Sequence, residues 1–384
     1  TLTLLIRFMV GSDLAAAGWR VGLLYGINTA GAALGALLTD FHLVPAQGVY
    51  ATQLVAVTLN LVAGVGALVL ATTFAPPRRP SVVAPVSAAG TADGAPPSAS
   101  GGAVVPLAAL ALALSGFAAM GVEILWFRYL SQILGQLRAV FSLLLAVMLV
   151  GIWLGSITGG YLHRRWGRPA FWFVVAQSLL VVVTLGLLGL FDHHAGYQRH
   201  VVGLRPDFAA AAATGRAWLA LWAALRPILL VVAVPSFLMG FAFPLANATV
   251  QRARASVGRT AGALYLANTV GNVLGASLVG FVLLPWLGIR LTTLGLCGCA
   301  AVSVVPLFLA AAPTRSARNR GPTRFALAGG LLVAGLSLFA FALLPSERLL
   351  LPTIPRDDQG GTRQIIAFSE GQNETIVVTE VPGY

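Results

Sequence analysis

The sequence predicts an all-α polytopic membrane protein with about nine transmembrane helices. Apolar residues make up 58% of the 384 residues, charged residues only 9%, and the mean hydropathy is +0.86. A water-soluble chain of this length needs more charge to cover its surface. The apolar residues are gathered into nine runs that are each long enough to cross a bilayer, and two of these runs share a sequence pattern.

The nine apolar runs cover most of the chain. Each has about 20–29 residues, which gives a helix roughly 30–43 Å long against a hydrocarbon core of about 30 Å. They are expected to be helical because unpaired backbone groups are too costly in lipid. The runs are residues 21–45, 50–74, 106–130, 138–162, 170–191, 222–250, 260–284, 289–312 and 325–344.

An internal repeat organises these runs. Residues 22–48 match residues 262–288, and about half of the aligned positions are identical. Both copies carry Tyr-x-x-Asn-Thr-x-Gly-x-x-x-Gly. We predict two related six-helix repeats lying parallel in the membrane, with the end of the first in residues 1–74 and the second in residues 104–312. The first repeat is then truncated, and we expect the chain to be part of a longer protein.

Arginine placement predicts the orientation. All 24 basic residues are arginine, and those in the loops cluster in every second loop. By the positive-inside rule these loops are cytoplasmic. Residues 313–345 then form an Arg-rich loop and an extra helix that runs outward, which places residues 346–384 outside the cytoplasm. The loop arginines are Arg78, Arg79, Arg164, Arg165, Arg168, Arg252, Arg254, Arg259, Arg315, Arg318, Arg320 and Arg324.

Two segments differ from the helical runs. Residues 75–103 are rich in Pro, Ala, Ser and Gly without periodicity, which predicts a disordered linker. Residues 346–384 hold half of the acidic residues. Within them two β-rich runs flank Glu370-Gly-Gln-Asn373, a pattern that predicts a hairpin opening a β-containing soluble domain.

The composition also excludes several classes of function. A net charge of +12 would suggest nucleic-acid binding in a soluble chain, but these arginines act as topology signals, so no nucleic-acid partner is expected. Cys297 and Cys299 lie two apart in an apolar run and point to different sides of a helix, which disfavours a disulfide or a thiol metal site. His193, His194 and His200 lie with Asp192 in a polar loop, and we predict no metal site there.

The repeated motif offers a candidate polar site. Asn28 and Thr29 in the first copy, with Asn268 and Thr269 in the second, place polar groups in the membrane, where each needs a partner. They could line a cavity between the repeats, or they could join helices by hydrogen bonds; the symmetry favours packing. Small-xxx-small pairs let helix backbones approach closely, and we predict helix packing at Gly31, Gly35, Gly271 and Gly275.

Glu123 is the one acidic residue inside any apolar run from residue 106 onward. A carboxylate in the membrane is costly and is a candidate for handling a proton or a cation. The alternative is an outer interfacial position with an ion pair to Arg128 or Arg138. No residue is assigned a catalytic role.

Several motifs resemble the membrane half of fused major-facilitator/spermidine-synthase-like proteins. The resemblance covers nearly all of the chain except the linker, residues 192–221 and residues 346–363. The motifs are Ser115-Gly-Phe-Ala-Ala-x-Gly-x-Glu123-Ile-Leu-Trp126, Phe141-Ser142, Gly151-Ile-x-Leu-Gly155-Ser156, Gly159-Gly160, Met239-Gly240 with Pro244, the repeated Tyr-x-x-Asn-Thr-x-Gly, and Phe368-x-Glu370-Gly371 before Thr375.

The resemblance implies an aminopropyltransferase-like domain that uses decarboxylated S-adenosylmethionine in polyamine synthesis. Its catalytic residues would follow Tyr384, so no cofactor is expected within the chain itself. The chain would anchor or serve that domain. The alternatives are a major-facilitator-like transporter of a small cation or polyamine, and a non-catalytic subunit of a membrane complex. The expected setting is the bacterial inner membrane, with lipid, other subunits or further copies of the chain as partners.

Overall fold

The computed structural model describes residues 17–73, 103–134, 138–190, 217–251, 257–312, 317–345, 364–370 and 375–380. Among these residues, seven helices are long and apolar enough to cross a membrane. The chain is thus an all-α multi-pass membrane protein in its fold, as the sequence predicts. The count of about nine crossings stays a prediction, because two of the seven, Gly26–Val69 and Thr260–Ala310, are 44 and 51 residues long.

The chain divides into two compact units. The larger comprises Thr1–Leu34 and Ser100–Tyr384, and the smaller comprises Gly35–Ala99. The smaller unit contains the end of helix α2 (Ala17–Leu38), the π-helix η1 (Thr39–Leu43) and helix α3 (Val44–Thr73). The larger unit contains the rest of α2 and the other described elements.

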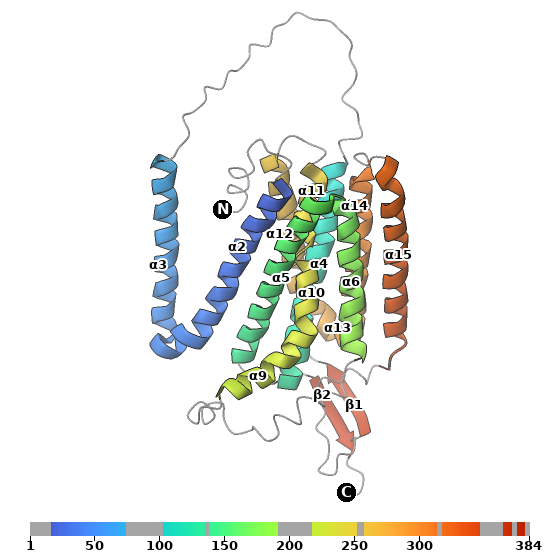
Figure 1. Ribbon diagram of the computed structural model, residues 1–384. Helices are drawn as coiled ribbons and strands as arrows, with labels where there is room; N and C mark the ends of the chain where they lie inside the picture. The colour runs from blue at the N-terminus through green and yellow to red at the C-terminus, as the bar shows by residue number, and fades with distance from the viewer. Residues whose placement is uncertain are drawn as a thin grey trace, which may run out of the picture. The chain divides into compact units, whose positions relative to one another are not determined.

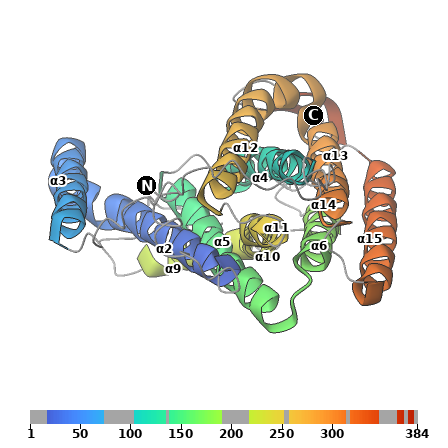
Figure 2. The ribbon, with the colours of Figure 1, turned by 90° about the horizontal axis from the view of Figure 1, so that it is seen from above.

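Helix α4 lies at the centre of the larger unit (Figures 1 and 2). It packs along α12 over much of its length and also contacts α11, α13 and α14. Besides the first part of α2, the larger unit contains α4 (Val104–Leu134), α5 (Arg138–Trp166), α6 (Pro169–Leu190), α9 (Ala217–Ile228), η3 (Leu229–Ala233), α10 (Val234–Met239), α11 (Ala242–Gln251), α12 (Val257–Leu278), η4 (Val279–Leu283), α13 (Leu284–Val302), α14 (Val304–Ala310), α15 (Ala317–Ala342), β1 (Gln364–Glu370) and β2 (Thr375–Glu380).

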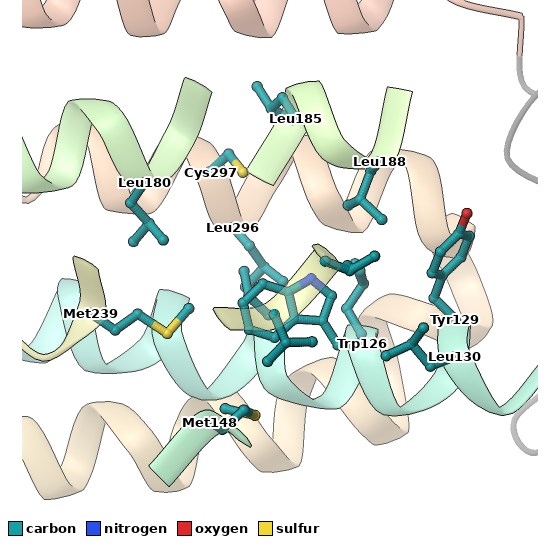
Figure 3. Packing of buried hydrophobic residues seen from close by; sticks show 14 of the residues in the cluster. Trp126, Tyr129, Leu130, Met148, Leu180, Leu185, Leu188, Met239, Leu296 and Cys297 are labelled. Carbon is teal, nitrogen blue, oxygen red and sulfur yellow. The ribbon is translucent and has the colours of Figure 1, made fainter. Parts of the chain in front are cut away.

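The apolar core of this unit is built around α4. Trp126 and Tyr129 of α4 are fully buried, with Leu188 of α6 and Leu296 of α13 in the same cluster. Figure 3 shows Trp126 in the middle of this cluster, with Met148 of α5 on another side. A second cluster near the other end of α4 is centred on Leu112. Both clusters exclude water from the interior, so the described bundle is held by close packing.

The α-helical hydrogen-bond pattern changes to a π-helical turn at three places, each just before a proline. The π-helices η1, η3 and η4 end two residues before Pro45, Pro235 and Pro285 respectively. A proline cannot donate to the carbonyl four residues earlier and its ring clashes with that carbonyl, so the hydrogen-bond ladder widens locally. The helices therefore continue past each proline with a local change in direction.

The two segments that share the repeated motif have the same local structure. Their helices, π-helices and following helices begin at matching positions, with α2, η1 and α3 corresponding to α12, η4 and α13. Shortly after the proline, Gly48 and Gly288 both adopt a positive φ, 76° and 70°, with ψ near 180°. Glycine alone adopts this conformation without strain. In the larger unit the chain reverses between α12 and α13 (Figure 2).

The tail contains the predicted hairpin. Strands β1 and β2 pair antiparallel, with Glu370 opposite Thr375 at the turn and an irregularity between Ile365 and Ala367. The two strands lie where the sequence predicts the two β-rich runs. Whether the hairpin opens a larger β-containing domain stays a prediction.

Four exposed arginines lie at one end of the larger unit, whereas the exposed Arg226 lies in α9 at the other end (Figure 1). Arg164, Arg165 and Arg168 lie at and just after the end of α5, and Arg324 lies in the first part of α15. The α5–α6 and α14–α15 junctions lie at the same end of the bundle (Figure 1). This arrangement agrees with an alternation of loops, while the side of the membrane stays a prediction. The predicted linker and the polar loop with His193, His194, His200 and Asp192 lie almost wholly outside the described residues.

Candidate functional site around helix α4

The second copy of the motif lies directly against α4. Asn268 of α12 is beside Gly116: a Cβ atom added to Gly116 would lie 2.8 Å from the Asn268 carbonyl oxygen and 3.0 Å from its Oδ1. One turn further along α12, the Asn272 amide donates to the Gly116 carbonyl at 3.0 Å and to the Asn268 carbonyl at 3.2 Å when its Oδ1 and Nδ2 are interchanged. Both amides therefore lie at the crossing of two helices.

Glycines bring the two backbones together at this crossing. A side chain at Gly271 would collide with the Ala113 carbonyl, and one at Gly275 would place its Cβ 2.5 Å from the Phe117 carbonyl oxygen. These neighbours are backbone atoms, which cannot move aside without shifting α4. Gly271 and Gly275 thus lie where a small-xxx-small pair allows close helix approach.

The first copy of the motif has different surroundings. Asn28 is exposed, and no atom lies within 4 Å of the position that a Cβ would take at Gly31 or Gly35. Thr29 is buried, on the side of α2 where Gly26 approaches Trp153 and Ile157 of α5. The packing role predicted for Gly31 and Gly35, and the cavity predicted between the two copies, stay predictions.

Thr269 does not face the crossing. It is exposed, and its hydroxyl donates to the Tyr265 carbonyl of its own helix at 2.9 Å. Thr29 and Thr269 occupy equivalent positions in the motif, yet one is buried and the other is exposed. The pair does not form one symmetrical lining in the described residues.

A second polar contact lies on another side of α4. Gln177 of α6 donates to Ser115 Oγ at 2.7 Å, and both side chains are buried. Because Ser115 precedes Gly116, α4 carries polar contacts to α6 and to α12 at the same level. Gln177 was not among the predicted site residues, although it is the only glutamine in its apolar run. That isolation in a long apolar run is the signal that could have found it.

Glu123 lies well inside the span of α4. It is half-buried, and it is about 14 Å along the helix from Gln132, where the span ends. No hydrogen bond or ion pair joins it to the part of the chain that the structure describes. The side chain of Arg138 is outside the described residues, so a pair with that residue stays a prediction. Glu123 is the charged candidate closest to the polar level of α4.

A second close helix crossing lies between α5 and α10. Side chains at Gly155 and Gly240 would collide with the Phe237 and Ile152 carbonyls respectively, and Gly151 approaches Ser236. Sequence analysis used Gly151, Gly155 and Gly240 only as motif residues. Their spacing, small residues four apart, was the available signal for packing.

Helix α15 packs against α6 at its middle and at its C-terminal end. Gly330 lies against Ser178 and Val174 of α6, and Gly189 of α6 lies against Phe341 and Leu344. The Arg290 guanidinium of α13 donates to the Ala342 carbonyl at the last residue of α15. A cation at the end of a helix satisfies a carbonyl that has no partner within the helix.

The remaining candidates are the two cysteines and the groups that could hold a metal ion. Cys297 is buried, Cys299 is half-buried and both thiols are free. No group of three His, Cys, Asp or Glu side chains that could hold a metal ion occurs among the described residues. The chain matches no family model, no curated protein and no solved structure.

Proposed function

We propose that the chain is the membrane-embedded part of a spermidine-synthase-like protein, which holds a C-terminal domain at the membrane. The observation that carries this proposal is the attachment of α15. Its contacts with α6 and the bond from Arg290 to Ala342 fix the point from which the chain continues to β1. A helix fixed at its last residue holds whatever follows it at a defined place on the bundle.

The helical part of this protein is proposed to consist of two related repeats. The matching bounds of α2–η1–α3 and α12–η4–α13, with glycines of positive φ at equivalent positions, support a common origin. If Gly26–Val69 and Thr260–Ala310 each cross twice, the described chain has nine crossings in the bacterial inner membrane. The last crossing is α15, after which the hairpin begins.

The polar positions of the motif support an anchor more than a transport site. The Asn272 amide donates to the Gly116 carbonyl, Asn268 lies beside Gly116, and Gly271 and Gly275 approach carbonyls of α4. Groups engaged in this way hold helices together. The proposed domain would transfer an aminopropyl group from decarboxylated S-adenosylmethionine, and its catalytic residues would lie outside this chain.

The test is an assay of the full-length gene product in washed membranes from a bacterial host that lacks its own spermidine synthase. Incubation with decarboxylated S-adenosylmethionine and putrescine should give spermidine in the membrane fraction. A protease site inserted between α15 and β1 should release that activity into the soluble fraction. Absence of spermidine from membranes that contain the intact, folded protein would overturn the proposal.

Glu123 favours a second candidate, transport of a small cation or polyamine. A half-buried carboxylate inside a membrane span could bind a cation. Vesicles carrying the protein should then take up radiolabelled putrescine, and Glu123→Gln should abolish uptake without changing the amount of folded protein. Equal uptake by the variant, or no uptake by either protein, would eliminate this candidate.

A further inference from the structure

The two copies of the motif bury opposite faces of equivalent helices. In α2 the buried positions are Thr29 and Ala33, at 5% and 3% exposure. Their counterparts in α12 are Thr269 and Val273, and both are exposed, Val273 at 59%. The packed face of α2 therefore corresponds to the open face of α12.

The reverse holds for the glycine face. Gly271 and Gly275 are buried against α4, whereas their counterparts Gly31 and Gly35 are exposed and have open space around them. Asn268 is half-buried beside Gly116, and its counterpart Asn28 is exposed.

Three residues on this face are the same in the two copies. Asn28, Gly31 and Gly35 are identical to Asn268, Gly271 and Gly275. On the opposite face Thr29 and Thr269 are also identical, but the copies differ at Gly26 and Ala33, which correspond to Leu266 and Val273. The copies have thus kept the same residues on the face that binds α4 in the second copy.

We propose that the Asn28–Gly31–Gly35 face of α2 is a docking site for one further transmembrane helix of the same polypeptide. This partner is an apolar helix with a small residue at the crossing point, as Gly116 is in α4. The inference rests on the proposed origin of the two copies as repeats. The second copy is the template for this inference. There Asn268, Gly271 and Gly275 pack against α4, and carbonyl groups of α4 approach the two glycines.

The energetics fit such a partner. Glycine destabilises a helix interior by about 1 kcal/mol relative to alanine. The two exposed glycines therefore destabilise α2, and no helix contact from the described residues offsets that cost at these positions. In lipid, helices associate through close backbone contact and through amide hydrogen bonds, both of which this face offers. An Asn side chain facing lipid alone is costly, and a docked backbone carbonyl would accept its hydrogen bond.

The test uses the full-length gene product in detergent, with Gly31→Leu and Gly35→Leu as variants. Because leucine is a better helix former than glycine, a fall in Tm must come from steric conflict. We expect both variants to lower the Tm as Gly271→Leu does. Gly64→Leu and Gly66→Leu on α3 are matched controls, since those glycines also have open space around them.

Two outcomes would overturn the inference. A Tm for Gly31→Leu and Gly35→Leu equal to that of the α3 controls would show that the face meets only lipid. A disulfide-linked dimer through Ala32→Cys, in a background without Cys297 and Cys299, would show that the occupant is a second copy of the chain. Either result leaves the transferase assay unaffected, so failure here is distinguishable from failure of the proposed function.

Discussion

Helices α2 and α12 share a sequence pattern and a backbone path, but they have different environments. Few residues of α2 and α3 are buried, whereas α12 and α13 contribute many residues to the buried interior of the larger unit. The π-helix and the glycine with positive φ occur in both. Local structure thus follows from residues within each copy, and burial follows from the neighbours that each copy meets.

The repeated motif therefore contains residues that determine the backbone conformation and residues that act only in helix packing. The positions of Pro45 and Pro285 and of the two glycines after them determine the backbone in both copies. The pair Gly271 and Gly275 acts only where a partner helix lies against it. Substitutions in one copy can therefore be compared with matched positions on the same helix or in the other copy.

The largest effect is expected for Gly275→Leu. Its side chain would overlap the backbone of α4 at Phe117, so we expect the free energy of unfolding to fall by about 3 kcal/mol. Thermal unfolding in detergent, followed by circular dichroism, measures the change. Gly262→Leu on the same helix is the control, because nothing lies within 4 Å of its Cβ position. Equal Tm values for the two variants would refute the close crossing.

The next effect should be the same in both copies. Gly48→Ala and Gly288→Ala each place a Cβ on a residue with positive φ, which should cost about 2 kcal/mol. The strain is local, so it does not depend on the neighbours. Unfolding of each variant in mixed detergent measures the cost. A loss confined to Gly288→Ala would show that packing, and not backbone conformation, selects glycine there.

A reciprocal exchange tests the anchor of α15. Arg290→Tyr introduces the residue of the first copy, since Tyr50 is the counterpart, and removes the bond to Ala342. We expect a loss of about 1 kcal/mol, because a charged hydrogen bond in a partly exposed position is screened. Hydrogen exchange should rise at the end of α15. The exchange Tyr50→Arg, at an exposed position, should leave both stability and exchange unchanged, and equal effects would contradict the account.

The smallest effect is expected for Asn272→Ala. Alanine is the first-copy residue, at Ala32, and its introduction removes the hydrogen bond to the Gly116 carbonyl. Hydrogen bonds between helices in lipid contribute about 0.6 kcal/mol on average. A series of unfolding curves should resolve this loss. An unchanged free energy of unfolding for Asn272→Ala would contradict the hydrogen bond to the Gly116 carbonyl.

The sequence was sufficient to predict the helical runs and the hairpin. Hydrocarbon forces long apolar segments into helices, and the turn residues between two β-rich runs mark the hairpin. The widened turns before Pro45, Pro235 and Pro285 were not predicted, although each proline was visible. The reason is that a proline can kink, end or widen a helix, and the tertiary packing selects among these outcomes.

The buried faces could not be predicted. In a soluble helix, polar residues mark the outer face, but lipid and a neighbouring helix are both apolar. Nothing in Ala33 or Val273 distinguishes the packed residue from the exposed one. The glycine pattern identified candidate contact faces and the sequence could not show which copy has its partner. Gln177 was visible as an isolated amide, but its partner Ser115 required the fold.

The most direct test of the central claim compares oxygen accessibility at two equivalent positions. Nitroxide labels are placed singly at Ala33→Cys and Val273→Cys, in the full chain without its native cysteines, in lipid bilayers. We predict low accessibility to oxygen at position 33, which is buried, and high accessibility at position 273, which is exposed. Equal accessibility at the two positions would contradict the claim that the two copies bury opposite faces.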